Sequence, residues 1–183
     1  MAARLSSTLA VLVIGCGGAA PTPAMTTVPN STAQAPSDPG LEARSARPQP
    51  ALDTATIGGV NFALLDGGHR CVLRIDGPEP GELAVEATPP CFFLRRASEQ
   101  PQVFSYPDVG VEAVAIFAGS PISAEQRELR KAPADALCGS TLQAVLIKAG
   151  QPSASKLVYR DSIGCRDLGK DEKYFWDFAH PNE

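Results

Sequence analysis

Four of the five cysteines, all beyond residue 70, carry the most distinctive side-chain chemistry in this sequence, because thiols can form disulfides, bind metals or take part in redox reactions. No two of them have the CxxC spacing that zinc and redox sites normally use, so we expect no metal site. An even number of cysteines instead favours two structural disulfides, as is common in proteins of oxidising compartments. Of the three possible pairings we favour the two that close the shorter loops, each contributing about 3 kcal/mol to stability. These pairings are Cys71 with Cys91 and Cys138 with Cys165.

A search for catalytic patterns finds one formal match, at Ser153–Lys156, to the SxxK pattern of penicillin-recognising serine enzymes. That chemistry requires a helix that places serine and lysine one turn apart, whereas this segment follows a Gly-Gln-Pro turn and leads into an expected strand. Two carboxylate pairs, Glu125 with Glu128 and Asp171 with Glu172, stand at the starts of expected helices, where acidic residues meet the helix dipole favourably. We therefore expect no catalytic residue, no cofactor and no enzymatic activity.

The strongest candidate for a binding residue lies in a cluster of aromatic side chains near the C-terminus. On a helix, Tyr174, Phe175 and Phe178 share one face, while Trp176 falls to one side of it. Two interpretations stay open: the helix closes the core with Trp176 half covered, or Trp176, together with Tyr174, contacts a partner. Trp and Tyr suit the second role because they bury a large area at low entropic cost.

The elements that must position these residues are mostly β-strands. Apolar and polar residues alternate, and turn signals recur about every 8–12 residues, which favours a single disulfide-bonded domain built as a β-sandwich or small barrel. The segment 141–149 fits either a strand or a helix. Short helices are expected at 123–131, where Ser123 and Gln126 form a capping-box pattern, and at 171–179. The expected strands cover 57–65, 70–75, 83–87, 91–96, 102–106, 111–118 and 156–161.

Composition divides the chain into a tether and one folded domain. Residues 16–56 are rich in Ala, Pro, Ser and Thr and poor in large apolar side chains, which predicts a disordered tether. All aromatic residues follow this segment, so we expect the folded β-rich domain to span 57–183. The net charge of −4 excludes a strongly basic nucleic-acid-binding protein. The two histidines, His69 and His180, stand alone in the sequence, and we expect each to be solvated or to cap an element.

The N-terminus has the order of an export signal: Arg4, a short apolar run over 5–14, and small residues. The apolar run is too short to span a bilayer as a helix. Its end, Val-Ile-Gly-Cys at 13–16, resembles the lipobox of bacterial lipoproteins. The resemblance covers residues 1–17, and the family of the folded domain is not recognised.

What the lipobox resemblance implies is a signal peptide at 1–15 that is cleaved off and a lipid attached to Cys16. The residue after that cysteine is Gly17 rather than Asp. By resemblance to lipoproteins of bacteria with two membranes, this implies export and anchoring at the outer membrane. Two or three acyl chains hold a protein stably on a membrane, whereas one chain gives only marginal affinity.

Together these features predict a lipid-anchored cell-envelope protein whose domain binds a partner without catalysing a reaction. The expected partners are the membrane, through the lipid anchor, and an envelope protein or a glycan; no nucleic acid is expected. A long tether suits this role because it lets an anchored binder search the space near a surface. The alternative is an inhibitor or immunity-type lipoprotein that blocks an envelope-active hydrolase.

Overall fold

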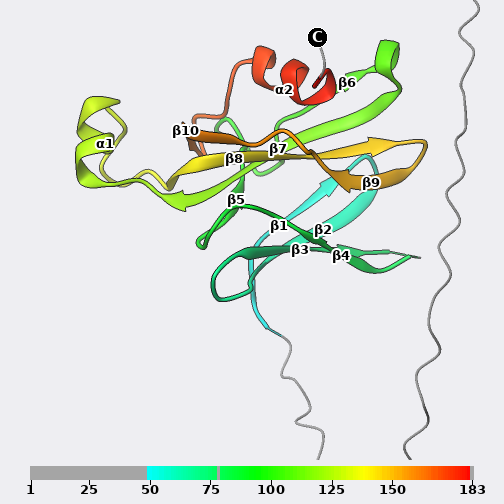
Figure 1. The fold of residues 1–183 in the computed structure, drawn as a ribbon, viewed down its shortest axis with the longest axis horizontal. Helices are drawn as coiled ribbons and strands as arrows, with labels where there is room; N and C mark the ends of the chain where they lie inside the picture. Colours follow the sequence, from blue (N-terminus) through cyan, green and yellow to red (C-terminus); the bar gives the residue numbers. More distant parts are fainter. Residues whose placement is uncertain (1–48, 78, 182–183) are drawn as a thin grey trace, which may run out of the picture. The chain divides into compact units, whose positions relative to one another are not determined.

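The computed structural model describes residues 49–77 and 79–181 as two antiparallel β-sheets and a covering helix (Figure 1). No helix in this described part is long and apolar enough to cross a membrane. In chain order the elements are β1 (Ala51–Ile57), β2 (Val60–Asp66), β3 (Cys71–Asp76), β4 (Gly81–Ala84), β5 (Phe92–Phe93), β6 (Val103–Tyr106), the 3-10 turn η1 (Pro107–Val109), β7 (Val111–Pro121), α1 (Ala124–Leu129), β8 (Cys138–Lys148), β9 (Gln151–Ala154), β10 (Tyr159–Cys165) and α2 (Glu172–Ala179).

The first sheet is a meander in the order β1-β2-β3-β4. Its first hairpin turns through Gly58 and Gly59, with φ of 55° and 81°. A two-residue hairpin turn with both φ angles positive favours glycine at both positions, because a Cβ atom strains the left-handed backbone. The Gly-Gly pair therefore fixes the register in which Ile57 faces Val60.

The second sheet is built around the long strands β7 and β8. Both β5 and β6 pair with β7 on the side away from β8, and β9 and β10 pair with β8 on its other side. Most residues of β7 and β8 are buried, because both faces of this sheet are covered. A strand buried on both faces shows no apolar–polar alternation, and this is why the segment 141–149 fits a helix as well as a strand.

Three layers result, with the second sheet in the middle (Figure 1). The first sheet packs on one face of it, and α2 packs on the other. The core is accordingly divided into two apolar clusters. The cluster between the sheets includes Phe62, Leu64, Leu73, Phe93, Phe117, Val145 and Ile147. The cluster under the helix includes Phe92, Leu94, Ile116, Leu142, Phe175 and Phe178.

Two disulfides fasten these layers, and both favoured pairings are confirmed. The bond between Cys71 and Cys91 joins the start of β3 to the segment before β5, and so links the two sheets. The bond between Cys138 and Cys165 joins the facing ends of β8 and β10. A Cβ atom on Gly119 would lie 2.5 Å from the Cys91 sulfur, so the glycine makes room for the inter-sheet disulfide.

The mainly β fold and both short helices are confirmed, with one boundary corrected. The first strand begins at Ala51, inside the segment 16–56 that was assigned to the tether. The folded domain therefore starts before residue 57, because β1 pairs with β2 along its whole length. Residues 1–48, which include Cys16 and the signal peptide expected at 1–15, lie outside the described residues.

Two strand predictions also change. The strand β9 was not predicted, and the strand expected at 156–161 lies at 159–165 as β10. Between them the ladder is interrupted. There the Ser155 hydroxyl accepts a hydrogen bond from the Ala144 backbone N–H at 3.0 Å and donates to the Leu157 carbonyl at 2.8 Å. The SxxK match at Ser153–Lys156 thus lies on extended backbone, where its serine and lysine are not one helical turn apart.

Candidate binding surface

The helix α2 positions the two aromatic residues singled out by the sequence. It begins after Asp171 and carries Glu172 in its first turn, where an acidic side chain suits the positive end of the helix dipole. Its buried face, made of Phe175, Phe178 and Ala179, packs on the second sheet. Because these residues anchor the helix, Trp176 is left at its side with 37% of its surface exposed.

The Trp176 ring is held in place by stacking on His180, one helical turn later. The two ring centroids are 4.2 Å apart and the ring planes differ by 12°. His180 itself is buried, with 5% exposed, and Tyr106 packs edge-on against its ring. One face of the indole is therefore covered by a ring that cannot easily move.

Both ring nitrogens of His180 face hydrogen-bond acceptors. Nδ1 lies 2.9 Å from the Trp176 carbonyl oxygen, and Nε2 lies 2.9 Å from Oδ2 of Asp108 in η1. The Trp176 carbonyl also accepts the His180 backbone N–H at 2.9 Å. The hydrogen bond from His180 in turn lowers the pKa of the Asp108 carboxyl. Asp108, His180 and Trp176 thus form a connected group, which we call the Trp176 platform.

Tyr174 lies on the opposite flank of α2 from the Trp176 platform. Its ring packs edge-on against Tyr159 of β10 at 5.7 Å, and Nζ of Lys170 lies 4.2 Å from its ring centre. The Trp176 platform instead contacts η1, which leads into β7 at the other edge of the sheet. The structure therefore does not bring Trp176 and Tyr174 together on one surface, and a partner that contacts both must reach around α2.

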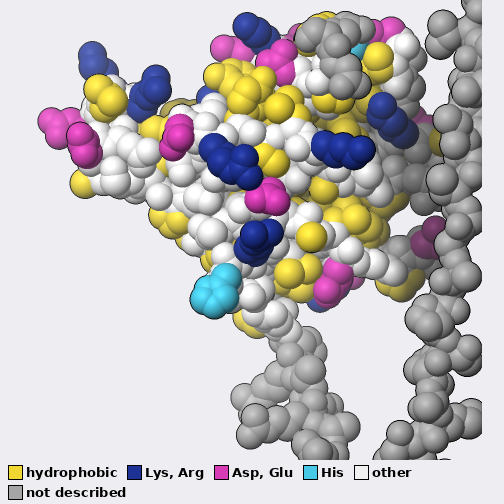
Figure 2. Space-filling model, viewed as in Figure 1, with side chains coloured by type: hydrophobic (Ala, Val, Ile, Leu, Met, Phe, Trp, Pro, Cys, Tyr) yellow, Lys and Arg dark blue, Asp and Glu magenta, His cyan; other side chains and the backbone are white. Residues whose placement is uncertain are grey.

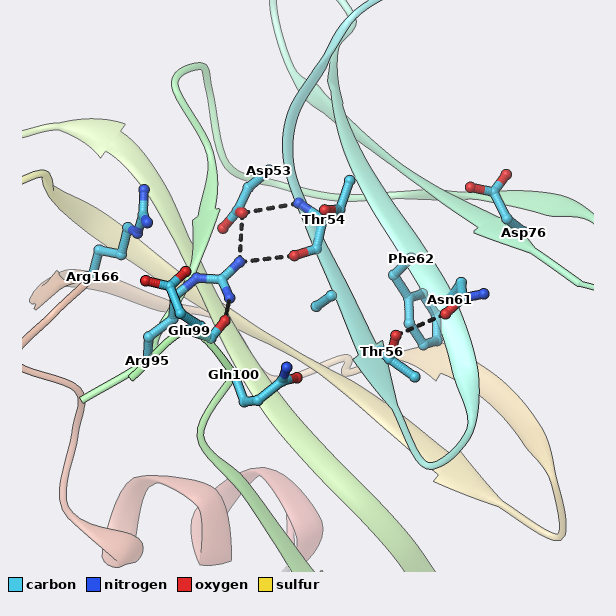
Figure 3. A pocket seen from close by; sticks show the side chains of 11 residues that line it. Asp53, Thr54, Thr56, Asn61, Phe62, Asp76, Arg95, Glu99, Gln100 and Arg166 are labelled. Atoms are coloured by element: carbon cyan, nitrogen blue, oxygen red, sulfur yellow. Dashed lines mark hydrogen bonds and ion pairs between the residues drawn. The ribbon is translucent and has the colours of Figure 1, made fainter. Parts of the chain in front are cut away.

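Apart from the Trp176 platform, a hollow lies where β1 meets the loop after β5 (Figure 3). It has a volume of about 600 Å³ and a mostly polar lining. At its floor Nη2 of Arg95 lies 2.5 Å from Oδ1 of Asp53 and donates to the Thr54 carbonyl at 2.8 Å. The other Asp53 oxygen accepts the Phe93 backbone N–H at 2.9 Å. Because Phe93 lies in β5 and Arg95 follows it closely, these contacts fasten β1 to the second sheet.

Sequence reasoning missed both the Trp176 platform as a group and the pair of Asp53 with Arg95. His180 follows Trp176 by four residues, so helical spacing was a signal that could have joined these two. Nothing local connects Asp108 to His180, since they are 72 residues apart in sequence. Asp53 fell in the segment assigned to the tether.

In the part of the chain that the structure describes, no group of three or more His, Cys, Asp or Glu residues is placed to hold a metal ion. A scan against models of protein families, a search of curated proteins and a search of solved structures found no match to this chain.

Proposed function

We propose that this chain is a lipid-anchored cell-envelope protein whose β-domain binds an envelope protein or glycan without catalysing a reaction. The observation that carries the binding role is the Trp176 platform. A large aromatic side chain is 37% exposed, yet its orientation is fixed by His180 and Asp108. Such a residue loses little freedom when a partner covers it, which is how Trp serves as a binding anchor.

The envelope location is supported by two independent features. The lipobox-like segment at 13–16 supplies the expected lipid attachment at Cys16. The two disulfides form and persist most readily in an oxidising compartment outside the cytoplasm. The outer membrane remains the proposed location, because Gly17 follows the cysteine.

The lipid anchor is tested with Cys16→Ser in the full-length protein. We expect the variant to stay uncleaved or to appear in the soluble fraction. The reason is that the expected lipid is attached through the cysteine sulfur, which serine lacks. Membrane fractionation with mass spectrometry of the N-terminus measures both outcomes. A variant that is cleaved and still sediments with membranes contradicts the anchor.

The binding role is tested with Trp176→Ala in the full-length protein, immobilised by its C-terminus and exposed to envelope extract. We expect any bound protein or glycan to be retained at least about tenfold less than by the unchanged protein, as for a truncated anchor residue. Leu52→Ala is the matched control, because Leu52 is 39% exposed and lies on β1, away from α2. Equal retention by all three proteins contradicts a binding role for Trp176.

The alternative, an inhibitor of an envelope hydrolase, is favoured by one feature, the connection between β7 and β8. It carries α1 away from the sheets (Figure 1), and Leu129 at the end of α1 is 76% exposed. A capping box of Ser123 and Gln126 and hydrogen bonds from Arg127 to two carbonyls hold the connection. If the retained partner is a hydrolase whose inhibition is lost in Leu129→Asp, this function replaces the first.

A further inference from the structure

Three positively charged side chains line one cavity of about 350 Å³ on the Tyr174 flank of α2. They are Arg130 and Lys131, which follow α1, and Lys170, which precedes α2. Asp161 is the one acidic residue in the same lining, so three cations against one carboxylate leave two positive charges. We call this group the cationic pocket.

Arg130 stands apart from the other arginines of residues 49–77 and 79–181. Each of the others has a side chain that makes an ion pair or a hydrogen bond, whereas the Arg130 guanidinium makes neither within these residues. The arginines with partners are Arg70, Arg74, Arg95, Arg96, Arg127, Arg160 and Arg166. Arg130 is exposed, so its donors face solvent and no other group of the described residues competes with an anion for them.

The backbone that carries these cations is fixed on both sides of the pocket. The backbone N–H groups of Arg130 and Lys131 donate to carbonyls of α1 at 3.1 and 3.0 Å. The side-chain amide of Gln102 binds Lys170 twice, accepting its N–H at 3.0 Å and donating to its carbonyl at 2.7 Å. The two segments are thus positioned before any ligand arrives, which lowers the entropic cost of binding.

We propose that the cationic pocket binds a phosphate monoester. Such a group carries about −1.5 to −2 charges near neutral pH, which matches the two uncompensated positive charges. Arginine offers paired donors that suit phosphate oxygens, and the lysines add point charges. The volume is that of a small-ligand site, and Ile163 and Leu168 supply an apolar wall for the group that bears the phosphate.

The charge pattern on the face of the domain drawn in Figure 2 favours a small ligand over an extended polyanion. On the face shown in Figure 2, Lys and Arg side chains are interspersed with Asp and Glu side chains rather than gathered in one broad basic area. A long acidic chain would meet repulsive carboxylates along such a surface. A single phosphate in the pocket would not.

Isothermal titration of the detergent-solubilised full-length protein with glycerol 3-phosphate tests the pocket. We expect Arg130→Gln and Lys170→Gln each to raise the Kd about tenfold, the size of one lost charge-assisted hydrogen bond. Lys156→Gln is the matched control, because Lys156 is an exposed lysine outside this lining. Thermal unfolding of each variant shows whether the fold is kept.

The outcomes separate the ligand sources and the competing explanations. Tighter binding of dihexanoyl phosphatidic acid than of glycerol 3-phosphate, lost in Arg130→Gln, assigns the phosphate to a lipid headgroup, and the reverse order assigns it to a soluble compound. An equal effect of all three substitutions, the absence of binding, or a preference for an acidic peptide overturns the proposal. Trp176→Ala should leave this Kd unchanged, so the pocket and the Trp176 platform can fail independently.

Discussion

Trp176 owes its fixed orientation to a residue that the chain places one turn away and to a carboxylate brought from a distant segment. His180 stacks on the indole, and Asp108 receives the second imidazole hydrogen bond. At the scale of single residues, the platform therefore depends on the hydrogen bond between Asp108 in η1 and His180 at the end of α2. Replacing Asp108 or His180 should therefore change the environment of the Trp176 ring, although the tryptophan itself is unchanged.

The Asp108 carboxyl should make stability depend on pH in the acid range. Its pKa is held below the ordinary value of 3.8, chiefly by the hydrogen bond from His180. A carboxyl whose pKa is lowered by folding stabilises the fold above its ordinary pKa, and this contribution is lost as the pH falls through the lowered value. We therefore expect Asp108→Asn to have a lower Tm than the unchanged protein near neutral pH and the same Tm in strong acid.

Thermal unfolding across a pH series measures this difference, and the single Trp reports on the platform by its fluorescence. Asp135→Asn is the control, because Asp135 is an exposed carboxylate on the β7–β8 connection. A Tm difference for Asp108→Asn that stays constant into strong acid would contradict this account of the Asp108 carboxylate.

At the scale of elements, the buried face of α2 holds the helix on the sheet, and the Trp176 platform contributes less to this packing. Phe175 and Phe178 are fully buried under the helix, whereas Trp176 is half exposed. We expect Phe178→Ala to lower the free energy of unfolding by about 3–5 kcal/mol, the usual cost of truncating a buried Phe. Trp176→Ala should cost less than about 2 kcal/mol, since a large part of its ring is already in water.

Urea unfolding of the two variants gives both values on the same scale. The order of the two losses is the decisive result. If Trp176→Ala destabilises the protein as much as Phe178→Ala, the tryptophan is a core residue and the platform loses its argument as a binding anchor.

The elements also differ in how well the sequence predicts them. The capping box at Ser123 and the helix after Asp171 depend on neighbours within one turn, so local patterns identified them. The strand β1 depends on pairing with β2, and its Ala- and Thr-rich sequence resembles the tether before it. The strand β8 gives no alternation because both its faces are buried. Contacts between residues far apart in the sequence determine both strands, and local sequence patterns do not predict such contacts.

The candidate site divides in the same way. Tyr174 and Trp176 were identified because aromatic residues crowd one short segment. Their spacing of two residues on a helix predicts that they face opposite flanks. It does not predict which residues each of them contacts. The packing of the whole domain brings Asp108 to His180, and it places Arg130 and Lys131 in one cavity lining with Tyr174. No pattern in the sequence connects these residues.

At the scale of the whole molecule, the two disulfides hold different parts of the domain. Cys71–Cys91 links the two sheets, and Cys138–Cys165 links two strands that are already paired. Replacing the inter-sheet pair by Cys71→Ser with Cys91→Ser should cost about 3 kcal/mol from chain entropy alone. A further loss is expected there because both sulfurs lie in the core between the sheets.

Urea unfolding of this double variant, beside the double variant Cys138→Ser with Cys165→Ser, makes the comparison. We expect the inter-sheet variant to be the less stable of the two. A larger loss from the Cys138–Cys165 variant would mean that the end of β10, and with it the cationic pocket, depends on its disulfide more than the sandwich does.

The position of β1 has a mechanical consequence for a domain held by its N-terminus. Any pull along the chain enters at β1, an edge strand that pairs only with β2 within its sheet. The ion pair of Asp53 with Arg95 resists the first displacement, because it fastens β1 to the second sheet. Once β1 and β2 are peeled away, the load reaches Cys71 and passes through a covalent bond to Cys91. The segment between Cys71 and Cys91, which includes β4, is thus shielded from tension on the N-terminal segment, because the disulfide carries the load past it.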